Sequence, residues 1–183
     1  MYADSTDDVK QVLEGMLNYA YYAEVVANGS SSLLIDFNQA SGAQLSSFDA
    51  KDFYDAGLVR DDVDGTAINS VATVGANLTD GVSLIFQVAD GVTVNSLTLQ
   101  VAGETFVYTP EGGYIEITDL HAGMIGAKLT LTFDTSEGEV VATYAIANYL
   151  DMVAQNGELS TAQNNLAKAA ALYMAAVRDY AMN

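Results

Sequence analysis

The chain has no cysteine and no tryptophan among its 183 residues, and it has a single proline. Without cysteine it can form no disulfide framework, no Cys-ligated zinc site, no iron–sulfur cluster and no thiol nucleophile. Basic residues are also scarce: 6 Lys and Arg stand against 24 Asp and Glu, which gives a formal net charge of −18. Such a charge repels phosphate backbones and anionic membrane surfaces, so we expect no nucleic-acid partner.

Long apolar runs are missing as well, since no stretch reaches the roughly 18 residues of a membrane span. We therefore expect no membrane insertion. The first residues, Met1–Asp8, lack the basic region and apolar stretch of a signal peptide. Half of the residues are apolar, so the composition is not that of a disordered chain. Little Lys, no Cys and much Asp, Ser, Thr, Gly and Ala favour an extracellular or cell-surface bacterial protein over a salt-adapted cytoplasmic one, which would have more Glu.

Three segments have the period of an amphipathic helix. Apolar residues recur at three- and four-residue steps in Ser5–Ala27, with Asn28 and Gly29 as a stop signal. The same holds for Tyr144–Gln155 and for Ser160–Ala181, where Ser160 is a candidate N-cap. Residues 30–65 are mixed, with an apolar run at Leu33–Phe37 and a short helix expected within Asp49–Leu58.

From Thr66 to Ala145 the period changes to two, which predicts β-strands. The alternation is clearest in Lys128–Phe133, where Leu129 and Leu131 face one way and the threonines the other. Glycine-containing turn signals separate the segments. The seven expected strands are Thr66–Val74, Val82–Ala89, Ser96–Val101, Glu104–Thr109, Gly113–Asp119, Lys128–Asp134 and Glu139–Ala145.

These elements predict one α+β domain over residues 1–183. We expect an antiparallel β-sandwich, or a single sheet of about six or seven short strands, packed against the N- and C-terminal helices. The last helix is rich in alanine, and small side chains let helices approach closely. The first and last helices should therefore pack together and bring the two termini near each other.

Four segments have recognisable motifs: a Leu-Asn-Tyr helix at Val9–Ala20, a Gly-Gly-Tyr strand at Glu111–Ile117, a connecting loop at Leu120–Gly126 and a closing Asn-Leu-Ala-Lys-Ala helix at Asn164–Tyr173. Together they resemble a module of large secreted and cell-surface proteins from Gram-positive gut anaerobes. The resemblance covers nearly the whole chain and implies an accessory role without known catalytic residues. Family members often have basic residues in the strand that matches Val82–Val88, and this chain has none there. Any binding role tied to those residues is therefore in doubt.

One acidic turn resembles a calcium loop. Asp61, Asp62 and Asp64 precede a glycine, and carboxylate oxygens are the ligands that Ca²⁺ prefers. The EF-hand pattern fails, because its first position would be Arg60 and its last would be Val71. An acidic surface turn is the simpler interpretation, and a looser calcium site at the three aspartates is left open. We expect no other cofactor.

Other catalytic patterns are weak or absent. His121 is the single histidine and follows a strand, two residues after Asp119, where a solvated or capping role is the simpler interpretation. The sequence has no Gly-x-Ser-x-Gly nucleophile motif and no glycine-rich phosphate loop. A pair of carboxylates for glycoside hydrolysis cannot be singled out by spacing.

Tyrosines are the second candidate for ligand binding. Tyr19 and Tyr22 belong to the first helix, and Tyr108 and Tyr114 flank a turn. Tyrosine rings stack on sugars and their hydroxyls bind polar groups, although they also pack helices and sheets. The absence of tryptophan, a frequent carbohydrate platform, favours packing.

These observations support three hypotheses about function. The first is a non-catalytic accessory or adhesion-type module of a bacterial surface or secreted protein, with protein or glycan partners. The second is a carbohydrate-binding module of a polysaccharide-degrading assembly, which should expose tyrosine rings on a sheet face. The third is a glycosidase, which should have a deep pocket with two suitably spaced carboxylates.

Overall fold

The computed structural model describes residues 6–31, 49–53, 71–77 and 81–182. Its contacts divide the chain into two compact units. The helical unit contains residues 1–53 and 150–183, and the sandwich unit contains residues 54–149. The single domain expected over residues 1–183 stays a prediction.

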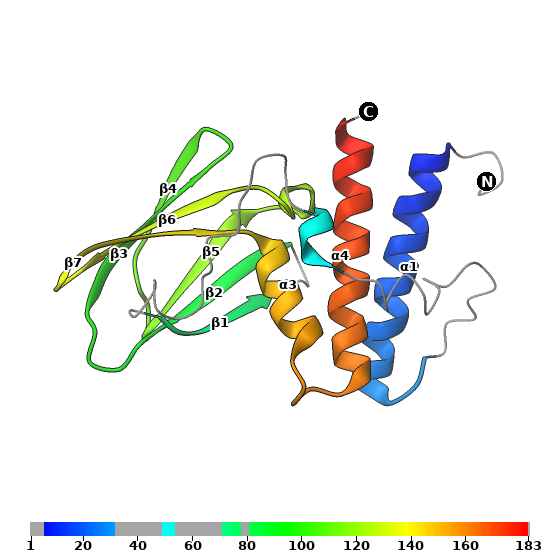
Figure 1. Cartoon of the computed structure of the whole chain (residues 1–183), viewed down its shortest axis with the longest axis horizontal. Helices are drawn as coiled ribbons and strands as arrows, with labels where there is room; N and C mark the ends of the chain where they lie inside the picture. Colours follow the sequence, from blue (N-terminus) through cyan, green and yellow to red (C-terminus); the bar gives the residue numbers. More distant parts are fainter. Residues whose placement is uncertain (1–5, 32–48, 54–70, 78–80, 183) are drawn as a thin grey trace. The chain divides into compact units, whose positions relative to one another are not determined.

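The observed elements follow the order helix, strands, helices (Figure 1). The α-helices of the described residues are α1 (Asp7–Asn28), α3 (Ile146–Gln155) and α4 (Thr161–Met182), with short 3₁₀ helices η2 (Ala50–Phe53) and η3 (Ala122–Met124). The strands are β1 (Val71–Asn77), β2 (Val82–Val88), β3 (Val94–Val101), β4 (Glu104–Tyr108), β5 (Tyr114–Leu120), β6 (Leu129–Thr135) and β7 (Gly138–Tyr144). The α+β class and the antiparallel sheets are confirmed. None of these helices is both long and apolar enough to cross a membrane.

Most element boundaries agree with the sequence within a few residues. The sequence placed Tyr144 in two elements, at the end of a strand and at the start of a helix; the helix assignment was wrong, because Tyr144 ends β7 and is buried. It packs edge-on against Phe86, with ring centroids 6.1 Å apart, so its apolar face belongs to the sandwich. The apolar run Leu33–Phe37 lies outside the described residues.

The strands of the sandwich unit form two antiparallel sheets. The three-stranded sheet has the order β1-β2-β5 and the four-stranded sheet the order β4-β3-β6-β7. Each sheet turns one face inward, as the period of two predicts. Leu84 and Phe86 of β2 are fully buried, as are Leu131 and Phe133 of β6. Phe86 and Phe133 join the sheets through an edge-to-face contact, with centroids 6.1 Å apart.

Two tight turns place their central residues in the left-handed region. Gly112 (φ +59°) and Gly113 (φ +85°) form the turn before β5, closed by paired backbone bonds between Glu111 and Tyr114 of 2.8 and 3.0 Å. Ala102 (φ +51°) and Gly103 (φ +86°) join β3 to β4. Two positive φ angles in succession define the type I′ turn that matches the twist of paired strands. Alanine is poorly suited to this position, because its Cβ crowds the backbone there.

In the helical unit α1 and α4 pack against each other, as the sequence predicted. A Cβ at Gly15 would lie only 2.9 Å from the Cα of Tyr173, so the absence of a side chain permits this approach. Four residues further along α1, the ring of Tyr19 stacks on that of Tyr173, with centroids 6.3 Å apart. The helices run in opposite directions, so the start of α1 and the end of α4 lie at the same end of the pair (Figure 1).

Polar contacts fix the ends of the helices in this unit. The Nδ2 of Asn164 donates to the carbonyls of Val153, Ala154 and Asn156 at 2.9–3.1 Å and thereby holds the end of α3 against the start of α4. Ser160 and Gln163 bond reciprocally as a capping box, which confirms Ser160 as the N-cap of α4.

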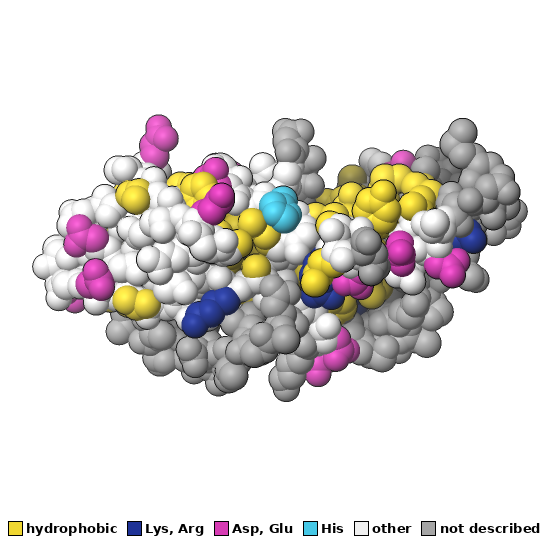
Figure 2. All heavy atoms as spheres, turned by 90° about the horizontal axis from the view of Figure 1, so that it is seen from above, with side chains coloured by type: hydrophobic (Ala, Val, Ile, Leu, Met, Phe, Trp, Pro, Cys, Tyr) yellow, Lys and Arg dark blue, Asp and Glu magenta, His cyan; other side chains and the backbone are white. Residues whose placement is uncertain are grey.

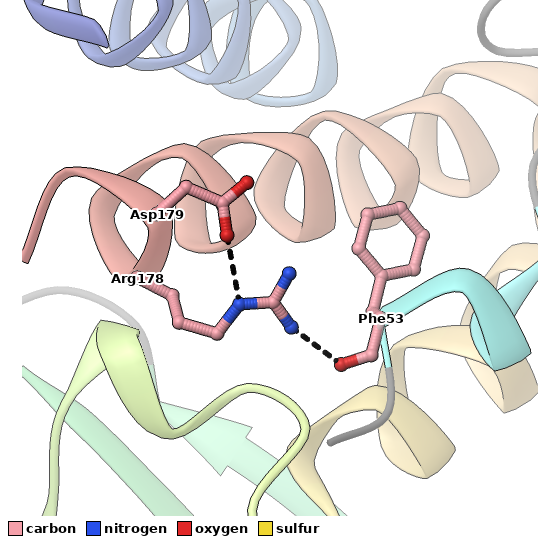
Figure 3. A network of polar contacts seen from close by, with 3 residues as sticks. All are labelled: Phe53, Arg178 and Asp179. Atoms are coloured by element: carbon pink, nitrogen blue, oxygen red, sulfur yellow. Dashed lines mark hydrogen bonds and ion pairs between the residues drawn. The ribbon is translucent and has the colours of Figure 1, made fainter. Parts of the chain in front are cut away.

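Near the other end of α4, the guanidinium of Arg178 donates a hydrogen bond to the carbonyl at the end of η2. The Nη1 of Arg178 donates to the carbonyl of Phe53 at 2.9 Å, and its Nε donates to Asp179 at 3.0 Å (Figure 3). The last carbonyls of a helix lack intrahelical partners, so a cation is well placed there. This contact joins residues 125 positions apart in the sequence.

Candidate ligand-binding site

The four predicted ligand-binding tyrosines do not belong to one unit. Tyr19 and Tyr22 lie in α1 of the helical unit, whereas Tyr108 and Tyr114 lie in the sandwich unit. One ring face of Tyr19 is covered by Tyr173, and burial raises the pKa of Tyr19. Tyr22 makes an edge contact with Tyr21, with centroids 5.1 Å apart. The ring of Tyr19 therefore packs α1 against α4, whereas the ring of Tyr22 contacts its neighbour in the same helix.

Tyr108 is held by a hydrogen bond between the two sheets. Its hydroxyl donates to Oδ2 of Asp119 at 2.6 Å, which joins the edge strand β4 of one sheet to the edge strand β5 of the other. Burial, followed by the hydrogen bond to Asp119 and its charge, raises the pKa of Tyr108 well above the ordinary tyrosine value. The phenol therefore stays neutral and bonded, and its role is to close this side of the sandwich.

Tyr114 is the one predicted tyrosine with a largely exposed side chain. It is 49% exposed and begins β5, where exposed residues alternate with the buried Ile115 and Ile117. The alternation places Tyr114, Glu116 and Thr118 on the outer face of the three-stranded sheet. This ring is free of the packing contacts that engage Tyr19 and Tyr22.

A β-bulge shapes the neighbouring part of this face. Between the pairs Leu84↔Ile117 and Val82↔Leu120, the two residues Thr118 and Asp119 oppose Ser83 alone. Both are exposed, because the extra residue breaks the alternation of the strand. The bulge thereby directs Asp119 toward β4, while Thr118 stays on the outer face.

Ser83 and Glu116 form a polar pair on this outer face. Ser83 is only 7% exposed, and its hydroxyl donates to Oε1 of Glu116 at 2.7 Å. They line an open depression of about 200 Å³, whose other walls are Asn77, Gly81, Val82 and Thr118. Drug-sized ligands occupy clefts of roughly 300–1,000 Å³, so this depression suits a smaller group.

Sequence reasoning found Tyr114 but missed Ser83, Glu116 and Thr118. The alternation of β5 was a usable signal for Glu116, because it lies two residues after Tyr114 between two buried isoleucines. Ser83 could not be found in this way. Its partner is 33 residues away, and only the register of β2 against β5 brings the two together.

A second open depression, of about 300 Å³, lies at the β3–β4 turn. Its lining comprises Lys128 and residues 100–105, among them Ala102 and Glu104. It has no aromatic side chain with an exposed ring. The depression lined by Ser83 and Glu116 lies instead on the sheet face that also presents the exposed Tyr114.

The predicted calcium ligands Asp61, Asp62 and Asp64 lie outside the described residues. Within residues 6–31, 49–53, 71–77 and 81–182, no three His, Cys, Asp or Glu side chains gather as a metal site would require. His121 is exposed before η3, and its side chain makes no capping bond. The space-filling view shows histidine at the surface and acidic side chains spread over the visible face (Figure 2).

No protein-family model, curated protein or solved structure matches this chain. The resemblance to the accessory module of secreted proteins therefore stays a prediction.

Proposed function

We propose that this chain is a non-catalytic accessory or adhesion-type module of a bacterial extracellular or cell-surface protein. The observation that supports it most directly is the outer face of the three-stranded sheet. There the exposed ring of Tyr114 lies on the same strand face as an open polar depression. A rigid sheet that presents an exposed ring and polar groups is suited to binding, and an open depression does little to exclude water from a reaction.

The side-chain contacts favour binding over hydrolysis. A glycosidase needs two carboxylates on either side of a scissile bond in a site that can exclude water. Among the residues that the structure describes, the carboxylate that lines the depression, Glu116, already accepts a hydrogen bond from Ser83, and Asp119 on the same strand accepts one from Tyr108. The net charge of −18 favours partners that are neutral or basic, and it disfavours nucleic acids.

A carbohydrate-binding module is the second candidate. The exposed Tyr114 favours it, because an aromatic ring on a sheet face is a stacking platform for sugars. This hypothesis predicts exposed tyrosine rings on a sheet face. Among the described residues of the sandwich unit, Tyr114 is the tyrosine with a largely exposed ring, and the hydroxyl of Tyr108 is bonded to Asp119.

The proposal is tested by measuring binding and turnover on the same purified protein. A glycan array and a pull-down from cell-surface extracts should yield a ligand whose binding saturates when it is re-measured with the purified component. Chromogenic glycosides and polysaccharides incubated with the protein should release no product. Catalytic product release that scales with enzyme concentration would overturn the non-catalytic proposal, and a specific sugar would select the carbohydrate-binding alternative. Labelling of intact cells with an antibody tests the surface location.

A further inference from the structure

The outer face of the three-stranded sheet brings an aromatic ring and a carboxylate to one side of one strand. Tyr114 and Glu116 are two residues apart on β5, and both are exposed. Strand geometry separates their Cα atoms by about 7 Å. This spacing is comparable with the length of one sugar residue in a glycan chain. A pyranose stacked on the ring of Tyr114 would thus place its neighbour, or its own edge hydroxyls, beside Glu116.

The carboxylate has an oxygen to offer to such a ligand. Oε1 of Glu116 accepts the hydroxyl of Ser83, and Oε2 accepts no hydrogen bond from the part of the chain that the structure describes. Ser83 is more than nine-tenths buried, so its hydroxyl holds the carboxylate in one orientation. Sugar hydroxyls are donors, and a hydrogen bond to a charged acceptor is about twice as strong as one to a neutral acceptor.

Charge disfavours anionic glycans as ligands of this face. Glu116 and Asp119 both lie on this edge strand, and the whole chain has a net charge of −18. Uronic acids and sulfated sugars would bring further negative charge to this face and be repelled. The open depression of about 200 Å³ also accommodates a single sugar residue better than a large rigid ligand.

We infer that the face formed by Tyr114, Glu116 and Ser83 binds a neutral glycan. Tyr114 stacks on a pyranose ring, Glu116 accepts sugar hydroxyls, and Ser83 is a positioning residue that orients Glu116. This inference rests on the proposed function as a non-catalytic binding module, and it names the ligand class and the site.

The test is affinity electrophoresis of the full chain in gels that contain mixed-linkage β-glucan, laminarin, xyloglucan or galactomannan, with polygalacturonate as the anionic comparison. At least one neutral polysaccharide should retard the protein, and polygalacturonate should not. Tyr114→Ala should lower the affinity for that polysaccharide about tenfold, because stacking on one ring is worth about that factor. Glu116→Gln should lower it severalfold, while the amide oxygen can still accept the bond from Ser83.

Matched variants separate the site from general effects on the protein. Tyr180→Ala removes a ring with 55% exposure from α4, and Glu139→Gln neutralises an exposed carboxylate on β7; both should bind as the unchanged chain does. Ser83→Ala should weaken binding, whereas Ser83→Thr should retain most of it, because threonine keeps the hydroxyl and the depression has room for a methyl group. The unfolding midpoint of each variant is measured alongside.

Each alternative result has a definite meaning. If no neutral polysaccharide of the panel retards the chain, the inference is overturned, and the pull-down alone decides whether the module binds a protein. If a neutral polysaccharide binds but Tyr114→Ala and Glu116→Gln keep full affinity, the assigned face is wrong while a glycan-binding function stands. Stronger retardation by polygalacturonate would overturn the assignment of a neutral ligand.

Discussion

Replacement of Gly15 by alanine tests the packing of α1 against α4 most directly, because two physical effects predict opposite signs. Alanine is the best helix former and glycine one of the poorest. On propensity alone the substitution in the middle of α1 should therefore stabilise the helix by about 1 kcal/mol. The structure predicts the reverse. The new Cβ would lie 2.9 Å from the Cα, 3.3 Å from the Cβ and 3.4 Å from the N of Tyr173.

The magnitude follows from which atoms are in the way. Two of these three atoms are backbone, so the crowding cannot be relieved by turning the side chain of Tyr173. The helices must separate, and overpacking of this kind costs about 1–3 kcal/mol. After the gain in propensity is subtracted, Gly15→Ala should destabilise the helical unit by up to about 2 kcal/mol. Gly15→Leu should cost clearly more, although leucine has nearly the helix propensity of alanine.

Urea unfolding followed by circular dichroism at 222 nm is the appropriate assay, because α1, α4 and most of α3 belong to the helical unit. Gln11→Gly, at an exposed position one turn earlier, calibrates the propensity effect and should cost about 1 kcal/mol. The double variant Gly15→Ala/Tyr173→Ala should not recover the lost stability. If Gly15→Ala and Gly15→Leu both stabilise the protein by the amount that Gln11→Gly loses, the close contact of the helices is wrong.

Three further predictions concern contacts elsewhere in the chain. Tyr108→Phe should cost about 1 kcal/mol in urea unfolding, less than the roughly 1.5–3 kcal/mol of a hydrogen bond to a charged group, because this bond is exposed to solvent. Burial and the bond to Asp119 raise the folded pKa of Tyr108, so the stability that its hydroxyl contributes is complete below about pH 10 and falls as the pH rises further. The gap between the unchanged chain and Tyr108→Phe should therefore narrow between about pH 10 and 12, and it would stay constant if the hydroxyl were neither buried nor bonded. Ala102→Asn should raise the stability by up to about 1 kcal/mol, since asparagine tolerates the left-handed region, and Gly103→Ala at φ +86° should lower it; equal signs would contradict the turn. Asn164→Ala should cost about 1–3 kcal/mol in the same assay, and Asn164→Asp, which has no donor, should fare no better.

The strands were predictable because their signals are local. In β6 the alternation of leucine, phenylalanine and threonine gave both the element and its buried face, and Leu131 and Phe133 are indeed fully buried. The turn at Ala102–Gly103 was predictable from an equally local signal, a glycine between two alternating segments. Tyr144 was assigned to both a strand and a helix, because an apolar residue at the junction of the two elements fits both periods. Its assignment depends on the contact with Phe86 of another strand, which no local pattern contains.

The candidate site depends on pairing between distant strands. Tyr108 and Tyr114 were predicted to flank a turn, and the backbone bonds between Glu111 and Tyr114 confirm a turn there, yet β4 and β5 belong to different sheets. β5 pairs instead with β2, and the bulge opposite Ser83 decides where Thr118 and Asp119 point. Side-chain alternation alone would have put Thr118 and Asp119 on opposite faces. The hydrogen bond from Tyr108 to Asp119 was therefore beyond what the sequence could predict.

The two outer faces of the sandwich unit differ in what they can recognise. On the four-stranded sheet the register aligns Val107, Thr98, Thr132 and Val141 in one row across the strands. This row is uncharged and its two valines are 67% and 56% exposed, so another apolar surface could cover it. Short methyl and hydroxyl groups on a flat sheet, however, provide no ring to stack on and no charged acceptor. The three-stranded sheet combines the exposed ring of Tyr114, a carboxylate fixed by a buried hydroxyl and a depression beside them. Directional hydrogen bonds give a binding site specificity that buried contact area alone does not. We therefore expect the outer face of the three-stranded sheet to bind a ligand specifically.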